Sequence, residues 1–81
     1  MYTLYILYSQ TIDRYYIGYT KDVARRLGEH NRKKGKFTDK GIPWNLVYSE
    51  EYDTKREAME REKYIKNKKS KIYIIELINS R

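Results

Sequence analysis

The chain has 81 residues, with 36% charged residues, a formal net charge of +7, no cysteine and one histidine. This length predicts a single domain, residues 1–81, whose small core hides about 60% of the surface of the unfolded chain. The composition excludes a disulfide framework, a thiolate nucleophile and two-histidine zinc sites, and with no membrane span or signal peptide in view we expect a cytoplasmic protein.

The first twenty residues predict a β-hairpin. Residues 2–8 and 15–20 are rich in β-branched and aromatic side chains, and the polar residues between them suit a hairpin connection. Leu4 and Ile6 point to one face of the first strand, whereas Tyr5 points to the other. Because both faces carry apolar groups, we expect this strand to be central in its sheet.

A helix and a third strand are predicted next. Thr20 is placed to cap a helix that runs to about Lys34 and is stopped by Gly35. Residues 35–43 predict a polar loop, and residues 44–49 have the composition of a strand.

Two further helices complete the chain. Thr54 and Glu57 form a capping box for a helix that ends at about Lys66. Ser70 is placed to cap a final short helix, although the propensities of residues 72–75 suit a strand equally well, and we predict a helix there. The predicted order is therefore β-β-α-β-α-α.

Glu62 is an acidic residue on the apolar side of the second predicted helix. It lies among Ala58, Met59 and Ile65 at helical spacings. A carboxylate at such a position is costly unless it is paired or binds a metal. An internal salt bridge to an arginine and metal ligation both remain open.

Other polar residues suggest phosphate chemistry. Arg26 and His30 lie four residues apart on one face of the first predicted helix, where they offer forked donors and a group that titrates near neutrality. Tyr5 and Tyr16 lie on neighbouring strands, and their hydroxyls can bind water or a phosphate oxygen. An ordinary helix edge and packing tyrosines are the alternatives. A site built from one carboxylate, one histidine, arginines and tyrosines suits metal-assisted phosphodiester hydrolysis.

Basic residues gather in two segments. Residues 21–40 contain eight basic and three acidic residues, a local charge of +5, and residues 63–71 contain five lysines and no acid. Two basic clusters on a small domain indicate a polyanionic partner. A lysine-rich soluble surface without such a partner is the alternative.

These residues together resemble the GIY-YIG nuclease domain. The resemblance covers nearly the whole chain, in the order Thr3-Leu4-Tyr5, Tyr16-Ile17-Gly18, Arg26-Leu27, His30-Asn31 and Glu62. It is best for small stand-alone bacterial members, and it extends to the excision-repair incision domain and the catalytic cores of junction endonucleases. Two positions depart from the family pattern: Thr3 replaces the first glycine, and Ile74 stands where the excision-repair members carry an asparagine.

The resemblance implies an α/β (α+β) fold with a small three-stranded antiparallel sheet flanked by helices. It also implies an endonuclease that uses Mg²⁺, with Mn²⁺ as a possible substitute, to hydrolyse DNA in repair or recombination. Tyr5 and Tyr16 would orient or deprotonate the attacking water, and Arg26 would stabilise charge on the scissile phosphate. His30 would assist the tyrosine–water network, and Glu62 would hold the metal ion.

DNA is expected to lie across the sheet face. Six lysines are predicted to hold its backbone: Lys33, Lys34, Lys36, Lys40, Lys68 and Lys69. RNA is an alternative substrate, and the expected state is a monomer or a weak dimer. Two alternatives to an enzyme are a basic module that binds nucleic acid without cutting it and a domain whose basic face docks an acidic protein. Mg²⁺-dependent nicking of supercoiled plasmid distinguishes an enzyme from a binding module.

Overall fold

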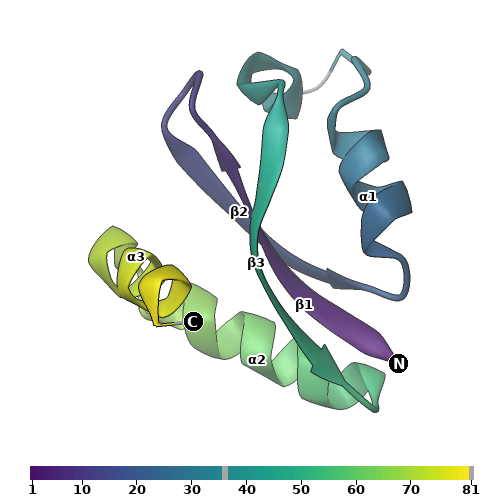
Figure 1. Cartoon of the computed structure of the whole chain (residues 1–81), viewed down its shortest axis with the longest axis vertical. Helices are drawn as coiled ribbons and strands as arrows, with labels where there is room; N and C mark the ends of the chain where they lie inside the picture. Colours follow the sequence, from purple (N-terminus) through teal and green to yellow (C-terminus); the bar gives the residue numbers. More distant parts are fainter. Residues whose placement is uncertain (36, 81) are drawn as a thin grey trace.

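The computed structural model describes residues 1–35 and 37–80 (Figure 1). Its elements follow the predicted order β-β-α-β-α-α, with one short 3₁₀ helix added before the third strand. They are β1 (Tyr2–Ser9), β2 (Arg14–Thr20), α1 (Val23–His30), η1 (Phe37–Gly41), β3 (Trp44–Tyr52), α2 (Lys55–Asn67) and α3 (Lys71–Asn79).

The three strands form one antiparallel sheet in the order β2-β1-β3. The fold class and the central position of β1 are therefore confirmed. Figure 1 shows the sheet between α1 on one side and the α2–α3 pair on the other. Of the helices in the described part of the chain, none is long and apolar enough to cross a bilayer.

Each face of the sheet has its own apolar cluster. On the side of α2 and α3, the buried residues are Leu4, Ile6, Ile17, Tyr48 and Ile65. On the side of α1, Tyr5, Leu7 and Trp44 are buried, with Leu27 of α1 packed against them. Alternation along β1 therefore sends the Tyr5 side chain to the α1 side.

α1 is shorter than predicted at its amino-terminal end. Its N-cap is Asp22, whose carboxylate accepts from the Arg25 amide at 3.0 Å. The prediction that Thr20 caps the helix is wrong, because the Thr20 hydroxyl instead accepts from the Asp22 amide at 3.2 Å. Thr20 thus supports the cap from outside the helix.

The carboxyl-terminal end of α1 also differs. The helix ends at His30 rather than Lys34, and Asn31 is its C-cap. The Asn31 amide is held by β3, since its nitrogen donates to the Trp44 carbonyl at 3.0 Å and its oxygen accepts from the Trp44 amide at 2.5 Å. This pairing pulls the chain out of the helix and fixes the end of α1 on the sheet.

The second half of the chain agrees better with the prediction. The capping box of Thr54 and Glu57 is present at the start of α2, and Ser70 caps α3, which is a helix. β3 continues three residues beyond its predicted end, to Tyr52. In α3 the side chain of Ile75 is exposed.

Candidate active site

Strand pairing places Tyr5 and Tyr16 together on the α1 side of the sheet. Tyr5 lies opposite Gly18, and Leu7 lies opposite Tyr16. The two tyrosines are therefore diagonal neighbours on one face. Their ring centroids are 6.4 Å apart, and the ring planes are within 19° of parallel.

Gly18 makes room for both phenols. A Cβ atom at this position would lie 2.7 Å from the Tyr5 hydroxyl oxygen, 2.9 Å from Tyr5 Cζ and 3.3 Å from Tyr16 Cε1. The two shorter distances mean that a side chain at residue 18 would displace the Tyr5 phenol, so the phenol lies where it does because residue 18 is glycine.

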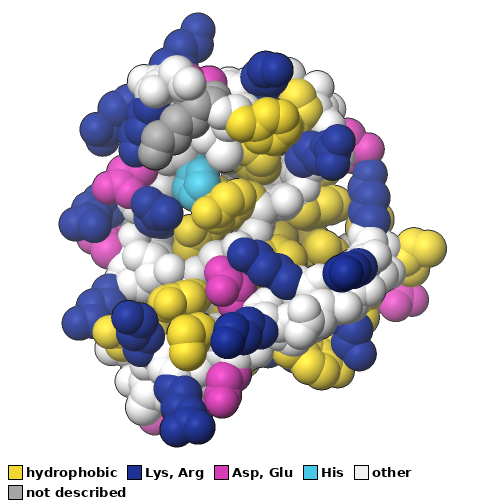
Figure 2. All heavy atoms as spheres, turned by 180° about the vertical axis from the view of Figure 1, so that it is seen from behind, with side chains coloured by type: hydrophobic (Ala, Val, Ile, Leu, Met, Phe, Trp, Pro, Cys, Tyr) yellow, Lys and Arg dark blue, Asp and Glu magenta, His cyan; other side chains and the backbone are white. Residues whose placement is uncertain are grey.

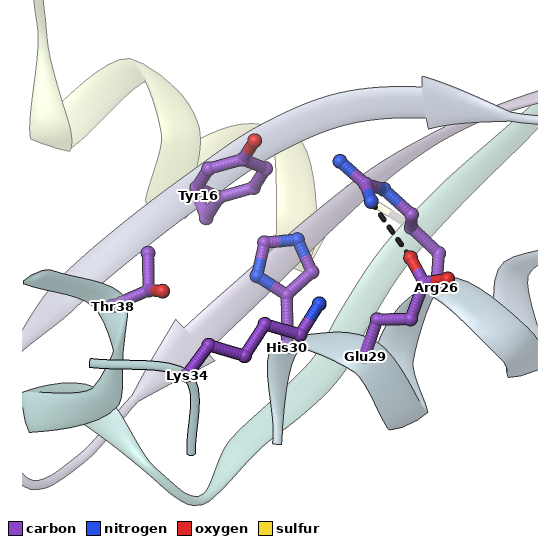
Figure 3. Close-up of a pocket in the computed structure, with 6 residues that line it drawn as sticks. All are labelled: Tyr16, Arg26, Glu29, His30, Lys34 and Thr38. Carbon is purple, nitrogen blue, oxygen red and sulfur yellow. Dashed lines mark hydrogen bonds and ion pairs between the residues drawn. The ribbon is translucent and has the colours of Figure 1, made fainter. Parts of the chain in front are cut away.

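α1 brings His30 against the tyrosines. The His30 ring meets Tyr16 edge-on, with centroids 4.4 Å apart, and lies 6.4 Å from the Tyr5 ring. Figure 3 shows His30 between the Tyr16 ring and the Arg26 guanidinium. His30 is buried, and its Nε2 atom has no hydrogen-bond partner within the described residues.

Arg26 is the fixed positive charge of the site. Its Nη1 donates to Glu29 Oε1 at 2.8 Å, one turn along α1. This hydrogen bond, and a weaker interaction with Tyr5, raise the pKa of Arg26 further above its ordinary value. The same bond lowers the pKa of Glu29, so the pair stays ionised.

The environment keeps His30 neutral. Burial lowers the pKa of His30, and the positive charges of Arg26 and Lys34 lower it further. The imidazole therefore carries no charge at neutral pH, and one of its nitrogens is an acceptor.

Tyr5 also stays neutral. Burial raises the pKa of Tyr5, the interaction with Arg26 offsets part of that rise, and the charges of Tyr16 and Glu62 add to it. Tyr5 therefore keeps its proton at neutral pH. The effect of Glu62 also means that its carboxylate lies within electrostatic reach of the Tyr5 hydroxyl.

These side chains border a cavity of about 150 Å³ (Figure 3). The lining residues are Tyr16, Arg26, Glu29, His30, Lys34 and Thr38. Sequence reasoning missed Glu29 and Thr38 as members of the site. The i,i+3 spacing from Arg26 is a signal for Glu29. No sequence spacing indicates Thr38, because the position of η1 depends on a contact that forms only in the folded protein. In that contact, Trp44 Nε1 donates to the Thr38 carbonyl at 2.9 Å.

Glu62 does not line this cavity. Its side chain is 19% exposed and pairs with Lys66 Nζ at 3.4 Å, one turn along α2. Among residues 1–35 and 37–80, the salt-bridge partner of Glu62 is thus this lysine and not an arginine. The neighbouring Arg61 pairs with Glu50 instead, at 2.9 Å.

The donor set around Glu62 fits a magnesium ion held loosely by the protein. Within residues 1–35 and 37–80, no group of three or more acidic, histidine or cysteine side chains could hold a metal. Mg²⁺ commonly uses one or two carboxylates, with water and substrate phosphates as its other ligands. The Glu62 carboxylate has little exposure and, among the described residues, its ion-pair partner is the half-exposed Lys66, so it meets that requirement.

Three predicted DNA-binding lysines of the first basic segment lie within the described residues. Lys34 lines the cavity, and Lys33 is exposed beside Lys34 in the chain. Lys40 lies over the exposed Phe37 ring, 5.7 Å from its centroid. Lys36 lies outside the described residues.

The two predicted DNA-binding lysines of the second basic segment make different contacts. Lys68 lies over the rings of Tyr64 and Tyr73, at 4.5 and 5.5 Å from their centroids. Lys69 instead lines two cavities beside β2. The structure therefore brings Tyr5, Tyr16, Arg26 and His30 together. It places the side chains of Lys68 and Lys69 in different surroundings.

Comparison with known proteins decides the family. Residues 1–79 match the model of the GIY-YIG catalytic domain. The chain belongs to the GIY-YIG family. The resemblance read from the sequence is confirmed, and a GIY-YIG domain is a nuclease domain, which makes nucleic acid its substrate class.

Several bacterial relatives carry the name UPF0213. The chain is 44% identical over 71 residues to the UPF0213 protein YazA of Bacillus subtilis, covering 83% of this chain and 72% of that protein. It is 48% identical over 56 residues to a UPF0213 protein of Streptococcus pneumoniae, covering 68% of this chain and 57% of that protein. The solution NMR structure of a UPF0213 protein from Bacillus halodurans is similar, with a TM-score of 0.63 and 28% identity over 100% of this chain and 86% of that one.

Proposed function

We propose that this GIY-YIG domain is a Mg²⁺-dependent endonuclease that hydrolyses DNA phosphodiester bonds in repair or recombination. One observation carries the proposal. Tyr16, Arg26 and His30, from two separate elements, border one cavity, and the Tyr5 hydroxyl interacts electrostatically with both Arg26 and Glu62. The cytoplasmic location expected from the sequence is part of this proposal.

Arg26 is assigned to the scissile phosphate. A guanidinium has five N–H donors, and the hydrogen bond to Glu29 uses Nη1 only. The remaining donors can bind phosphate oxygens, and their positive charge offsets the negative charge that grows on the phosphate as water attacks.

The tyrosines and His30 are assigned to the attacking water. Because its pKa is raised, Tyr5 acts as a neutral hydroxyl that orients the water. Tyr16 contacts the neutral His30 ring, so we assign to this pair the acceptance of the water proton. The proton would end on His30 Nε2, which has no hydrogen-bond partner among the described residues.

Glu62 is the residue that would hold the metal ion, Mg²⁺ or Mn²⁺. When bound, the ion polarises a phosphate oxygen and the leaving 3′ oxygen. Lys66 keeps the carboxylate paired in the free protein, and its half-exposed side chain can turn away from Glu62 into solvent.

The test is incubation of the purified chain with supercoiled plasmid, with Mg²⁺ or with EDTA. We expect relaxed circles that need the metal, and strong loss of nicking in Tyr16→Phe, which keeps the ring against His30 but removes the hydroxyl. Binding without nicking across several metals and substrates would contradict the proposal and favour a binding module.

A further inference from the structure

A groove runs along the open edge of β2. It lies next to the cavity bordered by Tyr16, Arg26 and His30, which we call the catalytic cavity. Tyr16 lines both the catalytic cavity and a second cavity of about 260 Å³. A third cavity, of about 570 Å³, follows toward the start of α3. The second and third cavities share Tyr15, Lys69, Ser70 and Ile74. We call these two cavities the β2 groove.

The groove has an apolar floor. Ile17, Ile65, Tyr15 and Ile74 belong to it, from β2, α2 and α3. Ile17 and Ile65 are buried, whereas Tyr15 and Ile74 are partly open to solvent. Figure 2 shows hydrophobic side chains continuing from the histidine across this face of the molecule.

Cationic side chains border this floor. Lys69 and Arg14 line the groove without an ion pair to any described residue. Lys66 is paired with Glu62, and Lys71 with Asp13 at 2.5 Å. Figure 2 shows the band of hydrophobic side chains edged by Lys and Arg. The rim therefore has more cationic side chains than acidic partners, and its net charge is positive.

The walls of the groove are held in place. Lys71 ties α3 to Asp13 in the β1–β2 turn, and the Tyr8 hydroxyl donates to the same carboxylate at 2.7 Å. At the α2–α3 corner, the Lys69 backbone has a φ of +48°, a left-handed conformation that is uncommon for a side chain other than glycine. A surface ion pair thus connects the β1–β2 turn with the start of α3 beside the groove.

An apolar floor with a cationic rim suits unpaired nucleotides. The flat faces of unpaired bases pack on aromatic and aliphatic side chains, while their phosphates reach the lysines at the rim. A duplex hides its base faces by stacking and presents only its backbone and groove edges, so it leaves such a floor without a partner.

We propose that the β2 groove binds the single-stranded nucleotides that flank the scissile phosphate. Tyr15 and Ile74 contact the bases, and Lys69 and Arg14 contact the phosphates. The inference rests on the proposed nuclease function and narrows its substrate to DNA with an unpaired arm beside the cut.

The first test compares binding of a blunt duplex with binding of the same duplex carrying a single-stranded arm on either strand. Fluorescence anisotropy is measured in EDTA so that nothing is cut. We expect the arm to tighten binding by about 10-fold, as base stacking on side chains typically does. Lys69→Gln should weaken binding of the substrate with the arm by a larger factor than binding of the blunt duplex, so that most of the gain from the arm is lost.

Lys55→Gln is the matched control. It removes the same charge from an exposed position at the far end of α2. It should leave the gain from the arm intact. An arm that adds no affinity, or a Lys69→Gln variant that weakens both substrates equally, would overturn the inference.

The second test locates the arm directly. Arms carrying 5-iodouracil are irradiated on the protein, and the crosslinked peptide is identified by mass spectrometry. We expect the crosslink at Tyr15, and crosslinks confined to α1 and η1 would overturn the inference. If the arm binds but no substrate is nicked, the proposed nuclease function is contradicted and the binding of the arm in the β2 groove is not. If substrates with and without the arm are nicked equally well, the role of the β2 groove is contradicted and the nuclease function is not.

Discussion

At residue 18 the lack of a side chain decides where a phenol can lie. The Tyr5 hydroxyl occupies space within 2.7 Å of the position that a Cβ atom would take. Glycine in a strand interior ordinarily costs stability, because it loses more backbone freedom on folding than other residues. The position of Tyr5 in the site is therefore maintained against a local cost in stability.

This arrangement predicts the effect of Gly18→Ala. The new methyl group must push the Tyr5 phenol away from its place, and displacement of a catalytic group by about 1 Å can cost about 100-fold in rate. We expect nicking to fall by about that factor, with a small change in melting temperature. Nicking kinetics and thermal unfolding of the same preparation measure the two effects.

Gly28→Ala is the control for this substitution. Gly28 lies in α1 with nothing within 4 Å of the position of an added Cβ. Alanine in a helix interior should stabilise the protein by about 0.5–1 kcal/mol and leave nicking unchanged. A Gly18→Ala variant that cuts as fast as Gly28→Ala would show that the place of Tyr5 is unimportant.

The neutral state of His30 predicts a pH dependence. Because burial, with help from Arg26 and Lys34, lowers the pKa of His30 in the folded protein, the unfolded chain binds a proton first as pH falls. The neutral His30 therefore contributes to the free energy of unfolding. This contribution is complete above about pH 6.5, and it is lost as pH falls through the lower pKa of His30 in the folded state.

Nicking should fall over the same range, since a protonated His30 can no longer accept a proton. In His30→Gln this acidic limb should disappear from the pH profile, together with most of the activity. Rate profiles between pH 5 and pH 8 check the prediction, and an acidic limb that persists in His30→Gln would assign it to another group.

Among the elements, α2 is held on the sheet by a polar network next to Glu62. Arg61 Nε and Nη2 donate to the two oxygens of Glu50 in β3, at 2.9 and 3.1 Å. The hydroxyls of Tyr52 and Tyr48 donate to the same carboxylate. Because Arg61 precedes Glu62, the network also fixes the helix at the turn that presents the proposed metal ligand.

Loss of the Glu50 charge should destabilise the protein. Glu50→Gln replaces charge-assisted hydrogen bonds with weaker ones, and we expect the free energy of unfolding to fall by about 2 kcal/mol in urea titrations at pH 7. Glu60→Gln is the control, because its partner Arg56 is 83% exposed and such surface pairs contribute about 0–1 kcal/mol.

The same network predicts acid sensitivity. Burial acts to raise the pKa of Glu50, but the hydrogen bonds from Arg61, Tyr48 and Tyr52 outweigh it and leave the pKa below its ordinary value. The stabilisation is therefore present above about pH 4.5 and is lost as pH falls through the pKa of the folded state. If Glu50→Gln has the same acid transition as the parent, another carboxylate is responsible.

The elements that local chemistry determines were predictable from the sequence. Thr54 and Glu57 satisfy each other within one turn, so their capping box was read correctly. The end of α1 was not predictable, because Asn31 leaves the helix to form hydrogen bonds with Trp44, thirteen residues away. Such a pairing needs the folded sheet, and no spacing in the sequence indicates it.

For the molecule as a whole, part of the candidate site follows from periodicity. The spacing of Arg26 and His30 puts them on one helix face, and the hairpin puts Tyr5 and Tyr16 on one sheet face. The approach of these two faces, and of Glu62 from a third element, depends on packing. For that step the sequence offered only the family resemblance, and the catalytic roles of these residues stay predictions.

The most direct measurement is the rate of Mg²⁺-dependent plasmid nicking by Glu62→Gln, with DNA binding of the same variant measured in parallel. We expect nicking to fall by at least about 100-fold, as for loss of an electrostatic contributor to the transition state, while salt-sensitive DNA binding stays within about 2-fold of the parent. A variant that binds and nicks DNA as its parent does would contradict the role of Glu62 and, with it, the single-metal site proposed for this domain.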